Sequence, residues 1–176
     1  MRTNSGFALL TLMALAAGAE PQIAVGSPLG NNAEMQTESG APQASGTVES
    51  RTLSVRLNQP FATVYEFLLN PANWNQWAFG LGKSLRHSNG EWIADSDGGV
   101  VKVHFTQRND FGVVDHTVIR TSGSRIYVPM RLIANGNGCE LLFTLFREPG
   151  MTDEHFNSDA KFVQRDLNGL KKLLDK

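Results

Sequence analysis

The chain has 176 residues, 41% of them hydrophobic, and a formal net charge of −1. This length and composition fit one globular domain with a tail. The first 50 residues hold one Arg and four Glu, so residues 51–176 carry 15 basic and 13 acidic side chains, a net charge of +2. Such a small imbalance, with the basic residues scattered, excludes the basic surface of a nucleic-acid-binding protein. We therefore expect no nucleic-acid partner.

The first 19 residues have the layout of a secretory signal peptide. Arg2 precedes an apolar run that ends at Ala17, and Ala17 and Ala19 form an A-x-A cleavage pattern. The run is too short to span a membrane and no cysteine follows it directly, so we expect no stable membrane anchor. The sequence predicts export, to the periplasm or outside the cell, after cleavage behind Ala19. The alternative is a translation start at Met35, which would leave the protein in the cytoplasm.

Residues 20–50 are rich in Gly, Ala, Ser, Pro, Asn and Gln and contain almost no apolar run. Such a segment cannot bury enough apolar surface to offset the entropy lost on folding, so we expect a disordered linker. Residues 51–176 are long enough to bury roughly two thirds of the surface of the unfolded chain. We expect them to form one domain on their own.

The domain begins with a strand and then turns helical. Residues 53–57 alternate apolar and polar side chains, which predicts a half-buried strand. Residues 60–71 place apolar side chains at helical spacing between two prolines, which predicts a helix. Residues 72–79 predict a second short helix that presents Trp74 and Trp77 three positions apart.

A series of short strands follows, separated by turn sequences such as Asn-Gly, Asp-Gly-Gly and Ser-Gly-Ser. Such tight turns connect antiparallel strands, so this part of the chain predicts a meander. The expected strands are residues 83–88, 91–95, 100–107, 113–120, 125–134 and 139–148. Residues 151–176 then place apolar side chains every three or four positions, which predicts one long amphipathic helix with Thr152 and Glu154 at its start.

These elements can bury their apolar faces together if a curved sheet wraps around the last helix. Over about residues 51–175 the chain resembles the START-like or SRPBCC superfamily, of the polyketide cyclase/dehydrase and lipid-transport type. The resemblance is carried by "SVRLNQPFATVYEFLLNPANWNQWAFGLG", "NDFGVVDH", "VPMRL" and "LFREPGM", followed by the terminal helix. It implies an α+β helix-grip fold, with a curved antiparallel sheet wrapped around a long C-terminal helix and two short helices after the first strand. The functions of the superfamily are diverse, so the resemblance specifies a fold rather than a reaction.

The stretch "RNDFGVVDH", residues 108–116, contains the tripeptide with which protein kinases hold magnesium. The chain lacks the Gly-rich phosphate loop, the strand lysine and the H-R-D loop of kinases, so we interpret the tripeptide as a coincidence. Asn109, Asp110 and Gly112 are good turn formers. We expect a turn that leads into a strand.

Asp115 and His116 are neighbours on this expected strand and would point to opposite faces, so they cannot act as a dyad. His116 alternates with Val114 and Val118. Periodicity alone does not decide which face is the inner one, and a packed, hydrogen-bonded histidine is one interpretation. The other, which we adopt as a prediction, places His116 toward a ligand cavity and Asp115 away from it.

Neither a metal site nor a nucleophile is predicted. The four histidines, His87, His104, His116 and His155, lack the spacing of metal ligands, and we expect no cofactor. Cys139, the one cysteine, starts an apolar run and is expected to be a buried thiol. No serine lies in a G-x-S-x-G motif, so we assign no catalytic residue.

The large apolar residues favour a ligand-binding cavity, because a strongly curved sheet beneath one helix tends to leave a hollow that such side chains line. Pro129, inside a strand-like run, indicates an edge or bulge that would re-aim Met130 and Arg131, and Arg131 could hold a ligand carboxylate or phosphate. The candidate ligand-binding residues are Trp77, Phe79, Phe105, His116, Met130, Arg131, Phe143 and Phe156.

The sequence thus favours binding, and also transport, of a hydrophobic small molecule such as a lipid, isoprenoid or polyketide-like compound beneath the C-terminal helix. This function needs no covalent chemistry. One alternative is an enzyme of the cyclase or dehydratase kind, in which His116, Asp115 or Arg131 would polarise a carbonyl or move a proton. Another is an interaction module like the chaperone-ATPase activators that share the fold. The sequence does not determine the oligomeric state.

Overall fold

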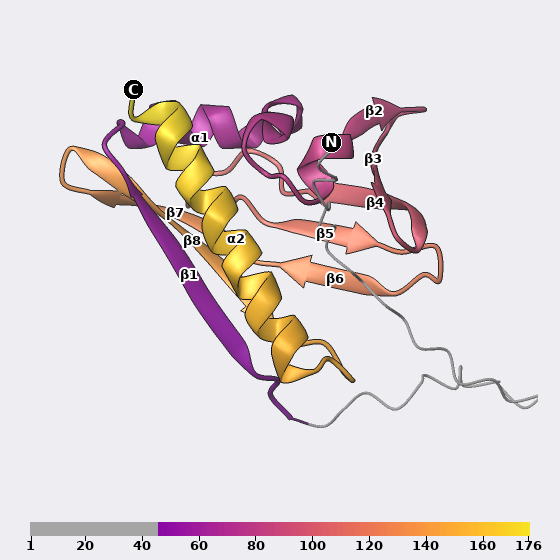
Figure 1. Cartoon of the computed structure of the whole chain (residues 1–176). Coiled ribbons are helices and arrows are strands. Elements are labelled where there is room, and N and C mark those ends of the chain that lie inside the picture. The colour runs from indigo at the N-terminus through magenta and orange to yellow at the C-terminus, as the bar shows by residue number, and fades with distance from the viewer. Residues whose placement is uncertain (1–45) are drawn as a thin grey trace, which may run out of the picture. The chain divides into compact units, whose positions relative to one another are not determined.

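The computed structural model describes residues 46–176, which include the whole predicted domain (Figure 1). The predicted signal peptide and nearly all of the predicted linker lie outside the described residues. The elements, in chain order, are β1 (Ser50–Leu57), α1 (Phe61–Leu69), the 3₁₀ helices η1 (Pro71–Gln76) and η2 (Leu81–Ser84), β2 (Arg86–Ser88), β3 (Glu91–Ser96), β4 (Gly99–Phe105), β5 (His116–Ile119), β6 (Arg125–Val128), β7 (Met130–Asn135), β8 (Gly138–Phe146) and α2 (Asp153–Leu174).

The strands form two antiparallel sheets, and α2 lies against them (Figure 1). One sheet has the order β2-β3-β4-β5-β6, and the other has the order β1-β8-β7. Every pair in the first sheet joins strands that are consecutive in the chain, as the turn sequences predict. The second sheet brings the first strand of the domain beside the last, with Ser50 opposite Phe146 and Leu57 opposite Cys139.

The two sheets meet where β6 passes into β7. The expected strand over 125–134 is interrupted at Pro129, which has no N–H to donate to a ladder. The carbonyl of Pro129 still accepts from the N–H of Thr144 at 3.0 Å, and Val113 forms an isolated bridge with Arg131. The surface therefore bends sharply at this corner without losing its hydrogen bonds.

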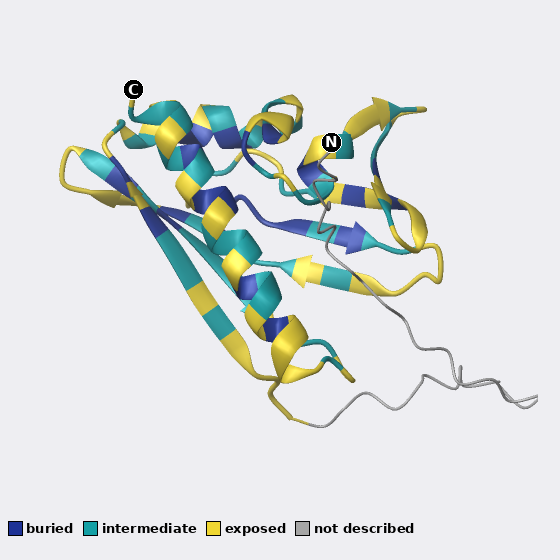
Figure 2. Cartoon of the chain, in the orientation of Figure 1, coloured by how far each residue is buried: buried dark blue, intermediate teal, exposed yellow. Residues whose placement is uncertain are grey.

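The long helix α2 has the sequence signals of a stable helix at both ends. The Thr152 side chain accepts from the N–H of His155 at 3.2 Å, acidic residues occupy the first turn, and lysines occupy the last turn. The buried residues lie along one side of the helix, which faces the strands (Figure 2). They are Phe156, Ala160, Asp166, Leu167 and Leu170. The predicted apolar stripe thus seals the sheets.

The segment after α1 positions two buried tryptophans. The Asn70 side chain caps η1 by accepting from the N–H of Ala72 at 3.1 Å. The Trp74 indole N–H donates to the carbonyl of Leu68 at 3.0 Å, which ties η1 to the end of α1. Trp77 packs against Trp74 in a tilted arrangement, with ring centroids 5.3 Å apart. The short helix expected over 72–79 is therefore a 3₁₀ helix at 71–76 with the expected tryptophan pair.

The turn before β5 is longer than the pattern suggested. The Asn109 Oδ1 atom accepts from the N–H groups of Phe111 and Val113, so the loop closes on its own side chain, and the strand begins only at His116. Gly112 has φ +67°, and a Cβ there would lie 2.1 Å from the carbonyl oxygen of Leu132. The tripeptide of residues 110–112 therefore forms a turn, and its glycine is required by backbone packing.

The expected strand over 83–88 is also shorter than predicted. Residues 81–84 form η2, and only residues 86–88 pair with β3. The Ser84 hydroxyl oxygen accepts from the N–H of Asp95 at 2.9 Å and so replaces a backbone ladder bond at this edge.

A candidate ligand cavity beneath the C-terminal helix

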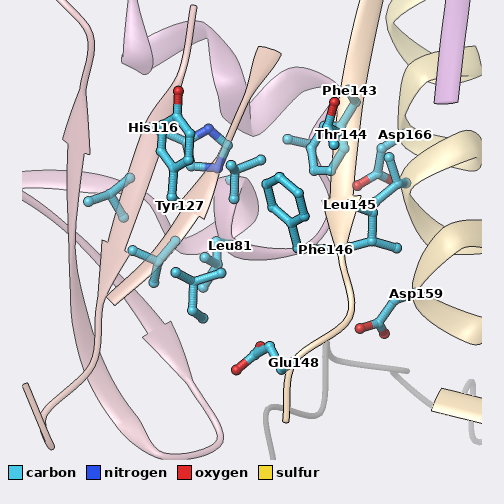
Figure 3. Close-up of a pocket in the computed structure, with 18 of the residues that line it drawn as sticks. Leu81, His116, Tyr127, Phe143, Thr144, Leu145, Phe146, Glu148, Asp159 and Asp166 are labelled. Carbon is cyan, nitrogen blue, oxygen red and sulfur yellow. The ribbon is translucent and has the colours of Figure 1, made fainter. Parts of the chain in front are cut away.

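A cavity of about 420 Å³ lies between α2 and the strands (Figure 3). Its lining comes from η1, η2, β4, β5, β6, β8 and α2. Most of the lining side chains are apolar; they are Val48, Trp74, Trp77, Ala78, Leu81, Val101, Val103, Val118, Ile126, Val128, Phe143, Leu145, Phe146, Pro149, Met151, Val163 and Leu167.

Strand alternation explains the sheet wall of the cavity. Val103 pairs with Val118 across the β4–β5 ladder, and successive side chains of a strand point to opposite faces. Val101 on β4 and His116 on β5 therefore lie on the same face as this pair. Val101, Val103 and Val118 are each no more than 3% exposed, and the side chains packed against them include Leu81 of η2 and Ile126 of β6.

His116 is the polar group of this wall. Its ring packs edge-on against Trp74, with centroids 4.9 Å apart, and lies 6.0 Å from Phe105. Burial lowers the pKa of His116 to about 4, because these apolar rings cannot replace the water that stabilises an imidazolium. The ring is therefore uncharged at neutral pH, and its Nδ1 atom has no hydrogen-bond partner among the described residues.

The charged residues of the lining are two arginines, Arg125 and Arg147, and three acidic residues, Glu148, Asp159 and Asp166. Figure 3 places Glu148 and Asp159 at the end of the cavity opposite His116. Glu148 is paired with Arg120 through two contacts of 2.8 and 2.9 Å. Burial raises the pKa of Asp159 and of Asp166, which lie on the face of α2 that lines the cavity. The cavity thus has an uncharged, aromatic part around His116, and the charged groups in the rest of its lining are of both signs.

Asp115 points away from the cavity and is part of the corner between the sheets. Its carboxylate accepts hydrogen bonds from the Tyr127 hydroxyl, the Arg131 guanidinium and, at 2.7 Å, the backbone N–H of Met130. Asp115 is 6% exposed and is not part of the cavity lining. These three hydrogen bonds link the segment just before β5 to β6, which precedes Pro129, and to β7, which follows it. His116, Asp115 and Arg131 therefore do not converge on one position, as proton transfer to a common substrate would require.

Three of the predicted ligand-binding residues, Trp77, His116 and Phe143, line the cavity. Each lies on a different element: the segment after η1, β5 and β8. The structure therefore brings together residues that are up to 66 positions apart in the sequence, Trp77 and Phe143 being the outermost.

The other five predicted residues do not line it. Phe79 is 48% exposed, on the outer side of the segment before η2. Phe105 pairs with His116 across the β4–β5 ladder, and its ring packs edge-on against Trp74 with centroids 4.9 Å apart. Met130 is fully buried in the core, and Arg131 is bound to Asp115 at the corner.

Phe156, the fifth, is fully buried at the start of α2, with the guanidinium of Arg51 4.5 Å from its ring centroid. Four of these five residues are large and apolar, and such a side chain fills the core as readily as it lines a hollow. Arg131, expected to hold a ligand carboxylate or phosphate, is instead bound to Asp115.

The lining residues that sequence reasoning missed include two groups with a recognisable pattern. The valines of β4 and β5 share a face with His116, so strand alternation could have identified them. Asp159, Val163 and Asp166 follow one another at helical spacing on α2, and Val163 belongs to the apolar stripe that predicted the helix. Sequence reasoning passed over them because small apolar and acidic residues are common on any strand or helix.

A curved pair of antiparallel sheets, a long C-terminal helix against them and short helices after the first strand define the α+β helix-grip fold. The predicted fold class is confirmed, and so, at the level of the fold, is the predicted resemblance to the START-like superfamily.

Solved structures with this fold include ChR145 from Cytophaga hutchinsonii, at 20% identity and a TM-score of 0.53, covering 73% of this chain and 96% of that one. MLL2253 from Mesorhizobium loti has 13% identity and a TM-score of 0.56, covering 72% of this chain and 97% of that one. The Aha1 dimer from Colwellia psychrerythraea has 14% identity and a TM-score of 0.55, covering 72% of this chain and 96% of that one. At such identities the likeness extends to the fold alone.

No model of a known protein family matches the chain. A search of curated proteins finds no relative. In residues 46–176, no group of three or more His, Cys, Asp or Glu side chains is arranged to hold a metal ion. Within the same residues, none of the helices has the length and apolar composition needed to cross a membrane.

Proposed function

We propose that the domain binds, and also carries, a hydrophobic small molecule such as a lipid, an isoprenoid or a polyketide-like compound. The observation that carries the proposal is the cavity of about 420 Å³ between α2 and the sheets. Ligand sites are concave and mostly apolar, with a few polar groups that orient the ligand. The cavity has this composition, with a wall of valines and aromatic rings interrupted by His116.

The size of the cavity also supports the proposal. Protein interiors are packed about as densely as organic crystals, and voids much larger than a water molecule are rare. An unfilled apolar hollow of this size sacrifices packing contacts along its lining. An apolar ligand restores those contacts, so ligand binding would offset the packing that the hollow loses.

The proposal can be tested with diphenylhexatriene, a fluorescent hydrocarbon without polar atoms. We expect the full chain to bind it, with the fluorescence increase that an apolar environment produces. Ile126 lies on β6 in the cavity lining, so Ile126→Trp should fill the space and weaken probe binding at least tenfold. The matched control is Ile133→Trp on β7, because Ile133 is 46% exposed and outside the lining.

Two outcomes would contradict the proposal. The unaltered chain could leave the probe fluorescence unchanged, or Ile133→Trp could weaken binding as much as Ile126→Trp does. In the second case the probe would be bound to an exposed surface or to a partly unfolded chain. Circular dichroism of both variants checks that each is folded.

A further inference from the structure

The cavity reaches the surface of the domain on the side of β6 and β8. The exposed residues of its lining all lie on or beside these two strands; they are Val48, Arg125, Tyr127, Phe146 and Pro149. The lining residues contributed by α2, β4, β5 and the 3₁₀ helices are buried or half-buried. The mouth of the cavity therefore lies beside β6 and the end of β8.

The lining along these two strands shows that the cavity passes between them. Successive side chains of a strand point to opposite faces, so a cavity confined to one face of a sheet is lined by every second residue. The lining instead includes all of β6, residues 125–128, and the unbroken run 143–149 at and after the end of β8. Unbroken runs on both strands mean that the cavity extends along two strand edges and reaches both faces.

The edges of β6 and β8 are not hydrogen-bonded to each other beyond the corner at Pro129. The Thr144 N–H donates to the carbonyl of Pro129 at 3.0 Å, but a proline has no N–H with which to return a bond. In the described part of the chain, β6 pairs with β5 alone, and β8 pairs with β1 and β7. A slot therefore separates β6 from the last residues of β8.

Two aromatic side chains flank this slot. Met130 pairs with Phe143, so the same register carried three residues further would place Tyr127 opposite Phe146. Tyr127 is 50% exposed and Phe146 is 37% exposed. Figure 3 shows both at the cavity, on different strands. The rim of the slot thus offers two exposed rings to an apolar molecule that arrives from water.

An ion pair joins the two sheets at the far end of the slot. Glu148 lies four residues beyond Thr144, and Arg120 follows β5 directly. The Arg120 N–H donates to the carbonyl of Ser124, the residue before β6, so Arg120 lies beside the end of β6 that is remote from Pro129. Its guanidinium contacts both carboxylate oxygens of Glu148, at 2.8 and 2.9 Å. The pair thus connects the sheets where the backbone ladder does not.

This ion pair can open without unfolding the domain. The Arg120 side chain is 21% exposed and that of Glu148 is 26% exposed. An ion pair that water reaches is weak, so its opening costs little. Opening it leaves every strand pairing in place, because it contributes no backbone bond. The pair therefore has the properties of a gate on the slot.

We propose that apolar ligands enter and leave the cavity through the slot between β6 and β8, and that the Arg120–Glu148 ion pair controls the rate of exchange. This inference rests on the proposed function and concerns how the same site is loaded. A gate acts on the barrier to exchange and not on the bound state. Association and dissociation then change by the same factor, and the affinity is kept.

The first experiment compares the exchange of diphenylhexatriene in the full chain and in Arg120→Gln, since Arg120 is not part of the cavity lining. In stopped-flow fluorescence with the protein in excess, the slope of the observed rate against protein concentration gives the association rate constant, and the intercept gives the dissociation rate constant. We expect both to rise about three- to fivefold, the factor that corresponds to a weak ion pair, while their ratio changes less than about twofold.

Two variants serve as controls for this substitution. Arg120→Lys keeps the positive charge, so its rate constants should stay closer to those of the unaltered chain than those of Arg120→Gln. Arg86→Gln removes an ion pair with Asp95, of 2.9 Å, at an exposed position outside the lining. It should leave both rate constants unchanged.

The second experiment obstructs the slot and leaves the ion pair in place. Arg125 is exposed at the edge of the slot, so Arg125→Cys can be coupled to a maleimide that carries a polyethylene glycol chain. The native thiol of Cys139 is 1% exposed, so the reagent reaches the introduced cysteine. The label should lower both rate constants by about threefold or more.

The matched control carries the same label at Phe79→Cys. Phe79 is 48% exposed and outside the lining, and a Cβ at Gly169 of α2 would lie 3.7 Å from its ring. The label then lies at the alternative way into the cavity, between α2 and the segment that joins η1 to η2. It should leave both rate constants unchanged.

The outcomes separate this inference from the proposed function. If the unaltered chain does not bind diphenylhexatriene, the cavity is not a ligand site and both proposals fail. If the chain binds the probe but the label at position 79 slows exchange and the label at position 125 does not, ligands enter beside α2 and the slot is not the route.

The ion pair is tested separately from the route. If Arg120→Gln behaves like Arg86→Gln, or lowers the affinity without changing the association rate constant, the pair does not gate the slot. In these cases the binding function stands. Circular dichroism checks that each variant is folded.

Discussion

His116 links the stability of the domain to pH. Its pKa is about 4 in the folded chain, against an ordinary value of 6.5, because burial among aromatic rings disfavours the charged ring. As pH falls below 6.5, the unfolded chain takes up a proton at this residue before the folded chain does. The folded state therefore loses stability between about pH 6.5 and pH 4.

We expect this loss to be on the order of 3 kcal/mol, from about 1.4 kcal/mol per unit of pKa difference. The measurement is urea unfolding of the unaltered chain and of His116→Phe from pH 7.5 to pH 4. The variant should lose less stability over this range. The raised pKa values of Asp159 and Asp166 act in the opposite direction, but these residues are present in both proteins. Equal pH dependence of the two proteins would show that His116 is not buried in its neutral form.

Asp115 has a structural role that its neighbour does not share. Its carboxylate accepts from Tyr127, Arg131 and the N–H of Met130 at the corner between the sheets. Asp115→Asn places an amide among these donors, so we expect a loss of about 1–3 kcal/mol in the free energy of unfolding. Binding of diphenylhexatriene should be nearly unchanged, because Asp115 is outside the cavity lining.

The control for this substitution is Asp110→Asn at an exposed position of the preceding turn, which should alter stability by less than about 0.5 kcal/mol. If Asp115→Asn weakened probe binding while keeping stability, the assignment of the two faces of β5 would be inverted.

At the scale of the element, α2 packs against β1 and forms part of the cavity. Leu167 is fully buried and also lines the cavity, so it contributes to the stability of the domain and to the shape of the site. We expect Leu167→Ala to lower the free energy of unfolding by about 2–5 kcal/mol, the range for emptying a packed leucine position. Chemical denaturation measures it.

The control on the same helix is Lys161→Ala, at an exposed position where alanine favours the helix slightly. A cost of less than about 0.5 kcal/mol for Leu167→Ala would mean that α2 does not seal the sheets.

At the scale of the whole molecule, we propose that the chain is exported and cleaved after Ala19. The motive is the apolar run that ends in an A-x-A pattern. N-terminal sequencing of the protein from its native host should find Glu20 as the first residue. A protein that begins at Met35 would instead support the alternative start, and with it a cytoplasmic location.

The sequence by itself determined the elements whose signals are local. The stripe of α2, with its Thr152 cap, and the turn-separated strands of the meander depend on residues within a few positions of one another, so periodicity was enough to find them. The order of these elements also predicted the helix-grip fold. His116 and Trp77 could be proposed as cavity residues because alternation and helical spacing constrain the direction of a side chain.

Only the tertiary structure decided which large apolar residues line the cavity and which fill the core. Phe143 and Phe156 look alike in the sequence, yet one faces the hollow and the other lies beneath the guanidinium of Arg51 at the start of α2. The difference depends on how the sheets bend at Pro129 and on the angle at which α2 crosses them. Both are properties of contacts between segments far apart in the chain, and no local pattern of residues specifies them.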